Sequence, residues 1–198
     1  MQADSKKKFR AVLVGGLVVG VGAAVTLAAW NDSEFAQGTF ASGQFNLEGS
    51  TTSSTEGFAD HPSSEDAAAL TFEVNPENMS PNDSVYAPFS VRLDETTTND
   101  ASVDITAAAG GTTTGMSYRL IQTEAFGCDS DTAGTDLVPA GTALGSVSGA
   151  AAFDLAKGAA ASAGEATNLC FIVTADDDMA QDQTGTSTWE FTATSKDS

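Results

Sequence analysis

Short runs in which apolar and polar residues alternate recur along the chain from residue 45 onward. Successive side chains of a strand point to opposite faces, so each run would turn its apolar members toward a core. Seven short strands separated by turn-forming residues predict an all-β fold, an antiparallel β-sandwich or jelly roll, with its main body in residues 67–198. The apolar members are Phe45 and Leu47; Leu70, Phe72 and Val74; Phe89, Val91 and Leu93; Val103 and Ile105; Met116, Tyr118 and Leu120; Leu169, Phe171 and Val173; and Trp189, Phe191 and Ala193.

Two stretches of the chain lack this alternation. Residues 49–66 are rich in Ser, Thr and acidic residues and poor in apolar ones, so we expect a flexible acidic loop there. Residues 150–163 are rich in Ala and contain Gly158, which leaves a turn of helix and a loop equally open.

The first 29 residues follow a different pattern. Lys6, Lys7, Lys8 and Arg10 precede an uncharged, mostly apolar stretch over residues 11–29. This arrangement is typical of a secretory signal peptide, predicted as a hydrophobic helix over residues 1–28 that precedes the sandwich. A transmembrane anchor is the alternative, since about 20 apolar residues span a bilayer. The glycines of the stretch and the small residues at its end favour cleavage. The chain is thus expected to be secreted, at the cell surface or outside the cell, and to meet the membrane only through the uncleaved signal.

The charge of the chain limits the classes of partner that it can bind, and its cysteine content bears on a disulfide. From residue 29 onward the chain has 26 acidic and 4 basic residues, a formal net charge of −22. Such a surface repels nucleic acid, because phosphate contacts require Lys or Arg. The two cysteines, Cys128 and Cys170, are consistent with one disulfide in an exported chain, and two unrelated buried thiols are the alternative.

The residues of known catalytic sites are missing from the sequence. His61 is the only histidine, whereas a zinc protease needs two or three converging ligands, and no G-x-S-x-G motif occurs. We therefore expect no enzyme, no catalytic residue and no cofactor. The acidic group Asp176, Asp177, Asp178 and Asp182 is a weak calcium candidate, with a solvated loop as the alternative.

Three motifs near the N-terminus occur in a distinctive order. They are residues 26–32 (TLAAWND), 38–43 (GTFASG) and 45–47 (FNL). This series resembles the TasA/camelysin family, exported proteins of Gram-positive bacteria that are processed by the SipW-type signal peptidase. Residues 79–86 resemble the family's Pro-Gly-Asp turn, with Asn82 in place of Gly, and residues 185–194 resemble its terminal strand.

The resemblance implies signal cleavage between Ala28 and Ala29 by the signal peptidase, a jelly-roll-like sandwich and a role as a biofilm-matrix or surface fibre subunit. In fibre-forming members an N-terminal segment freed by cleavage adds as a strand to the next subunit, which would make a homopolymer. The candidate donor here lies within residues 29–48, with Trp30, Phe35 and Phe40 as anchors. Three alternatives stay open: the segment pairs within its own domain, the chain is a camelysin-like secreted metalloendopeptidase, or it is a monomeric surface binding module.

Overall fold

The computed structural model describes residue 34 and residues 37–38, 42–73 and 76–196. The chain divides into two units, Met1–Ala41 and Ser42–Ser198, and the second contains the strands described below. The predicted signal-peptide helix lies outside the described residues. Among those that are described, no helix has the length and apolar character needed to cross a membrane.

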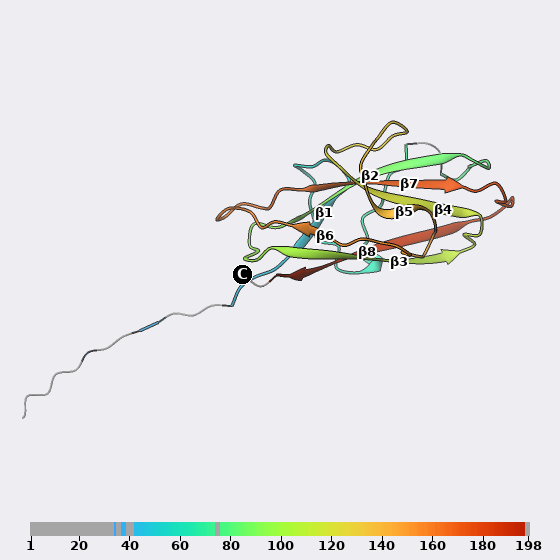
Figure 1. Cartoon of the computed structure of the whole chain (residues 1–198). Helices are drawn as coiled ribbons and strands as arrows, with labels where there is room; N and C mark the ends of the chain where they lie inside the picture. The colour runs from blue at the N-terminus through green and yellow to red at the C-terminus, as the bar shows by residue number, and fades with distance from the viewer. Residues whose placement is uncertain (1–33, 35–36, 39–41, 74–75, 197–198) are drawn as a thin grey trace, which may run out of the picture. The chain divides into compact units, whose positions relative to one another are not determined.

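In the described residues, eight strands form two antiparallel sheets, which lie as two layers (Figure 1). The larger sheet has the order β1 (Leu47–Ser50), β2 (Ser84–Leu93), β7 (Thr167–Ala175), β4 (Met116–Thr123) and β5 (Thr135–Ala143). The smaller sheet has the order β6 (Phe153–Leu155), β3 (Ala101–Gly111) and β8 (Gly185–Ser195). A 3-10 turn, η1 (Ser64–Asp66), lies between β1 and β2. The predicted all-β sandwich is confirmed.

The alternation of apolar residues correctly identifies several of the strands that build the core, β2 and β7 among them. Phe89, Val91 and Leu93 of β2 are buried against Leu169 and Phe171 of β7 in one apolar cluster between the sheets. The chain passes from one sheet to the other after β2, β3, β5, β6 and β7, as in jelly-roll-like sandwiches. Each crossing brings residues distant in sequence into the same core.

Several of the predicted elements differ from the observed ones. Residues 70–73 form no strand, although Leu70 and Phe72 pack against the core and the Glu73 amide donates to the Tyr86 carbonyl at 3.2 Å. Phe45 lies outside β1 and is 38% exposed.

Two strands were missing from the sequence prediction. In β5 the adjacent Leu137 and Val138 are both buried, which breaks the period of two. The Ala-rich stretch contains β6, whose Phe153 and Leu155 are buried, so neither a helical turn nor a loop describes all of it.

The segment predicted as a flexible acidic loop, residues 49–66, has several fixed contacts at its start. Ser50 lies at the end of β1 and is only 1% exposed. Its hydroxyl donates to the Glu56 carbonyl at 2.6 Å and accepts hydrogen bonds from the amides of Thr52 and Ser53. Serine side chains thus satisfy the backbone of this turn, although few apolar residues are available to bury.

Candidate functional site

Four strands lie at the edges of the two sheets: β1 and β5 in the larger sheet, β6 and β8 in the smaller. An edge strand exposes backbone N–H and C=O groups that can pair with another chain, unless the edge is short, bulged, interrupted by proline or covered. β6 has three residues and β1 has four. Gly49 of β1 also exchanges two backbone hydrogen bonds of 3.0 Å with Ala59. Both edges are therefore poor templates for an added strand.

The edge strand β5 is interrupted in two ways. Pro139 lies within it and lacks the N–H that a pairing strand needs. Its register against β4 shifts between Tyr118 and Ile121, which bends the ladder. Gly141 adds a left-handed backbone conformation with φ of 79°. β5 is thus also protected against pairing with a further strand.

The edge strand β8 is long, pairs with β3 without a register shift and is not interrupted by proline. Its 11 residues pair with β3 over their full length, from Ala101 opposite Ser195 to Gly111 opposite Gly185. It contains no proline, and Glu190 is its one charged residue. Within the described part of the chain, no strand pairs with its other side. The free side of β8 is therefore the candidate functional site, a surface suited to the addition of a strand.

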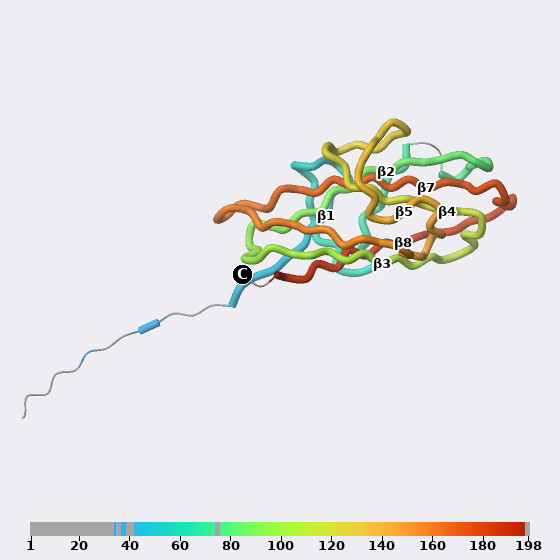
Figure 2. The backbone as a smooth tube through the Cα atoms, in the orientation of Figure 1, coloured from blue at the N-terminus to red at the C-terminus, as the bar shows by residue number. Residues whose placement is uncertain are grey.

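Aromatic contacts fix β8 to the opposite sheet. The Trp189 ring lies 4.7 Å from the Phe171 ring and 5.4 Å from the Tyr118 ring, centroid to centroid. The Phe191 ring lies 5.8 Å from that of Phe89. Pairs of this kind contribute about 0.5–1.5 kcal/mol each beyond the burial of their area. Figure 2 shows the continuous course of β8 beside β3, so the free edge belongs to a well-anchored strand.

Tyr118 also connects this aromatic group to a loop. Its hydroxyl donates to the Ser146 carbonyl at 2.7 Å, in the connection between β5 and β6. Burial raises the pKa of the Tyr118 hydroxyl above its ordinary value.

The residues that follow the candidate donor in sequence are held by a group of polar contacts, here called the clasp: Gln44, Asn46, Asp94, Thr97 and Thr98. The backbone amide of Asn46 donates to the Thr97 hydroxyl at 2.8 Å. The backbone amide of Asp94 donates to the backbone carbonyl of Asn46 at 3.1 Å. The Thr98 amide donates to the Gln44 carbonyl at 3.0 Å. The clasp therefore fixes residues 44–46 to the turn that joins β2 to β3.

The Asp94 carboxylate is the acceptor at the centre of the clasp. It receives the Thr97 hydroxyl at 2.8 Å, the Thr96 amide at 3.0 Å and the Asn46 side-chain amide at 3.3 Å. Desolvation by burial acts to raise the pKa of this carboxyl, but the hydrogen bonds donated to its charged form outweigh that effect. The pKa of Asp94 therefore lies below its ordinary value.

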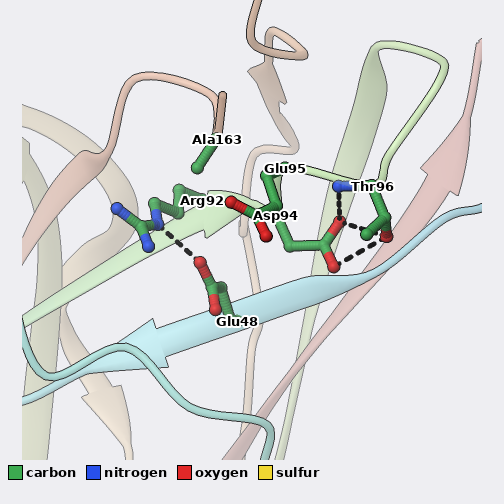
Figure 3. A pocket seen from close by; sticks show the side chains of 6 residues that line it. All are labelled: Glu48, Arg92, Asp94, Glu95, Thr96 and Ala163. Carbon is green, nitrogen blue, oxygen red and sulfur yellow. Dashed lines mark hydrogen bonds and ion pairs between the residues drawn. The ribbon is translucent and has the colours of Figure 1, made fainter. Parts of the chain in front are cut away.

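A pocket of about 310 Å³ lies next to Asp94. Figure 3 shows Glu48 of β1 and Arg92 of β2 turned toward each other, with 2.6 Å between Arg92 Nε and Glu48 Oε1. The Arg92 guanidinium also lies 3.9 Å from the centre of the Phe58 ring. The lining residues are Glu48, Arg92, Asp94, Glu95, Thr96 and Ala163, which include no His, Cys or Ser. The Glu48–Arg92 ion pair joins β1 to β2.

The structure brings together one of the predicted pairs of residues. Cys128 and Cys170 are placed at disulfide distance, with Cα atoms 5.2 Å apart. Cys170 is fully buried, but it faces away from the main core, because its neighbours Leu169 and Phe171 occupy that core. With Ile121 the two cysteines form a second apolar cluster on the other face of the larger sheet. The residues Ala28, Ala29, Trp30, Phe35 and Phe40 lie outside the described residues.

The acidic residues proposed as a weak calcium site do not converge. In the described ranges no three or more His, Cys, Asp or Glu side chains are grouped so that they could hold a metal ion, and this includes Asp176, Asp177, Asp178 and Asp182. Asp176 instead accepts a hydrogen bond of 2.7 Å from the Ser117 hydroxyl. His61 is exposed in the segment that follows β1.

The sequence analysis did not identify the clasp or the free edge of β8. Asn46 belongs to the FNL motif, but its partners within the clasp, Asp94 and Thr97, are 48 and 51 residues away along the chain. Comparison of the chain with models of known protein families and with curated proteins finds no match.

Proposed function

We propose that this chain is an exported, non-enzymatic structural protein of the TasA/camelysin kind, a biofilm-matrix or surface fibre subunit. Subunits would join when the N-terminal segment of one molecule adds as a strand to the free edge of β8 in the next. Export is supported by the N-terminal charge and hydropathy pattern and by the cysteine pair at disulfide distance. Cleavage between Ala28 and Ala29 would free the donor.

The unprotected edge of β8 is the observation that carries this proposal. Natural sheets protect long edges because an exposed edge promotes association between chains. Among the described strands, three edges are short, bulged or interrupted by proline, whereas the longest edge, β8, is none of these. The candidate donor, residues 29–40, has 12 residues, and β8 has 11. At about 3.3 Å per residue, one donor extends over the whole edge.

The position of the clasp favours donation to a second molecule over pairing within one chain. Gln44 is bound to Thr98, and Ala101, three residues further on, pairs with the last residue of β8, Ser195. A donor that folded back along its own β8 would therefore run parallel to it. Every strand pair in the two sheets is antiparallel, and parallel pairing is slightly less stable per residue.

Assembly of the processed chain tests the proposal. The chain that begins at Ala29 should form polymers in negative-stain microscopy and light scattering, whereas the chain that retains residues 1–28 should not. A processed chain that remains monomeric at every concentration would exclude strand donation and would support a monomeric binding module.

Charged substitutions on the exposed face distinguish β8 from its neighbour. Lysine on an edge strand opposes the approach of a further strand, so T188K/T192K should block polymers. The control T106K/A108K places the same charge on the same face of β3, away from the β8 edge, and should still polymerise. Equal thermal unfolding of the two variants would show that folding is not the cause.

The non-enzymatic part of the proposal has its own test. The purified chain should cleave no protein substrate, with or without a chelator. Chelator-sensitive proteolysis would favour the camelysin-like alternative instead.

A further inference from the structure

A segment ahead of β2 has the side-chain pattern of a strand but is not paired as one. In residues 68–73, here called the strap, half-buried and exposed side chains alternate. The half-buried side chains, which pack against the main core, are those of Ala68, Leu70 and Phe72. Such alternation is that of an extended chain with one face on the core.

The backbone of the strap has little to hold it. The backbone hydrogen bond that connects it to the rest of the described chain runs from the Glu73 amide to the Tyr86 carbonyl of β2, at 3.2 Å. Alternate residues of a strand direct their backbone groups to the same side, so Pro88 faces the same edge as Tyr86 and has no N–H to offer there. β1 pairs with β2 only from Ser90 onward. The strap is therefore held mainly by its apolar side chains.

Contacts across the core place β8 and the outer edge of β2 on the same side of the sandwich. On the opposite side, Ala109 of β3 lies against Gly145, which follows β5. β8 is the next strand after β3, and its Phe191 ring lies 5.8 Å from the Phe89 ring of β2. The free side of β8 and the edge of β2 that meets the strap thus border one opening between the sheets. The apolar side chains of the strap enter the core through this opening.

We propose that the incoming strand of a second copy docks at β8 in exchange for the strap. A strand added to β8 lies about 4.8 Å beyond it and turns every second side chain into the opening that Leu70 and Phe72 occupy. The exchange keeps apolar contacts with the core and adds the backbone hydrogen bonds that the strap lacks. The strap shields the core of the free subunit until that exchange. This inference rests on the strand addition of the proposed function.

Thiol labelling of the processed chain tests the exchange. L70C and A69C place a cysteine on the half-buried and the exposed side of the same strap. In the monomer, L70C should be protected from a maleimide relative to A69C, and in polymers it should lose that protection. F72C repeats the measurement at the second half-buried position.

The rate of assembly gives an independent measurement. L70A removes an apolar contact of the strap, which raises the population in which the strap is released. Light scattering should therefore show a shorter lag before L70A polymerises. The control T71A alters the exposed side of the strap and should leave the lag unchanged. Thermal unfolding of both variants shows whether they are folded.

The outcomes separate this inference from the proposed function. Polymers in which both L70C and F72C keep the protection of the monomer overturn the exchange and leave the fibre proposal intact. A lag that is no shorter for folded L70A than for T71A also overturns the exchange. A processed wild-type chain that forms no polymers overturns strand addition itself, and the exchange with it.

Discussion

Asp94 is the single residue on which most of the clasp depends. The Asp94 carboxylate accepts hydrogen bonds from Thr97, Thr96 and Asn46. The backbone amide of Asp94 also donates to the Asn46 carbonyl. Hydrogen bonds to a charged group are about twice as strong as neutral ones. The turn that holds residues 44–46 should therefore weaken when the charge is removed.

We expect D94N to lower the free energy of unfolding at pH 7 by about 1 kcal/mol, the usual contribution of a lost hydrogen bond. The folded-state pKa of Asp94 is depressed, so its stabilisation is present above the unfolded pKa of about 4 and is lost as the pH falls through the folded value. Denaturant unfolding from pH 7 to pH 2 should show the wild type approaching D94N at low pH. The control D178N removes a charge from an exposed residue and should have little effect. A constant difference between wild type and D94N across this range would contradict the assignment.

The connection between β4 and β5 is the element that the cysteine pair holds in place. Cys128 lies in this connection, and Cys170 lies on β7. Tyr86 and Ile172 pack against the cluster that the cysteines form with Ile121. The connection thus covers part of the face of the larger sheet that points away from the main core.

Removal of the cysteine pair by C128S/C170S should lower the free energy of unfolding by about 2–4 kcal/mol, because a loop of 42 residues is no longer closed in the unfolded chain. Hydrogen exchange should speed up in residues 124–134 and remain slow in β2. Reducing agent should bring the wild type to the same stability and leave the variant unchanged. If reduction does not alter the wild type, the two sulfurs are not bonded in solution.

For the molecule as a whole, acidic charge is the dominant surface property. With 26 acidic and 4 basic residues from residue 29 onward, the carboxylates repel one another in the compact state. Among the described residues, three of these four cations, Arg92, Arg119 and Lys196, form ion pairs with carboxylates. The Arg119–Asp136 pair joins β4 to β5.

Added salt should therefore raise the Tm by several degrees, since 1 kcal/mol corresponds to about 2–4 °C for a domain of this size. The Debye length falls from about 10 Å at 0.1 M to about 3 Å at 1 M, which screens the repulsion. Thermal unfolding in 0.05–1 M sodium chloride measures the effect, and potassium chloride should give the same curve. A Tm that falls with salt would show that ion pairs, rather than repulsion, dominate this surface.

The sequence by itself determined the class of the fold and most of its strands. A buried strand face leaves a period of two in the sequence, as in Phe89, Val91 and Leu93, and this signal is local. The turn at Asn82 was expected only from the resemblance to the Pro-Gly-Asp turn, and the structure gives Asn82 the positive φ that asparagine tolerates and glycine otherwise supplies. β5 was missed because adjacent buried residues and a shifted register erase that period.

Only the tertiary structure decided which edges are open and which polar residues meet. The order of strands places β8 at an edge, and no property of its own 11 residues records that position. Likewise, Asn46 meets Asp94 across 48 positions. The alternation of side chains in the sequence shows which residues lie on each face of a strand. Which strands lie beside that strand depends on pairing between segments that are distant in the sequence.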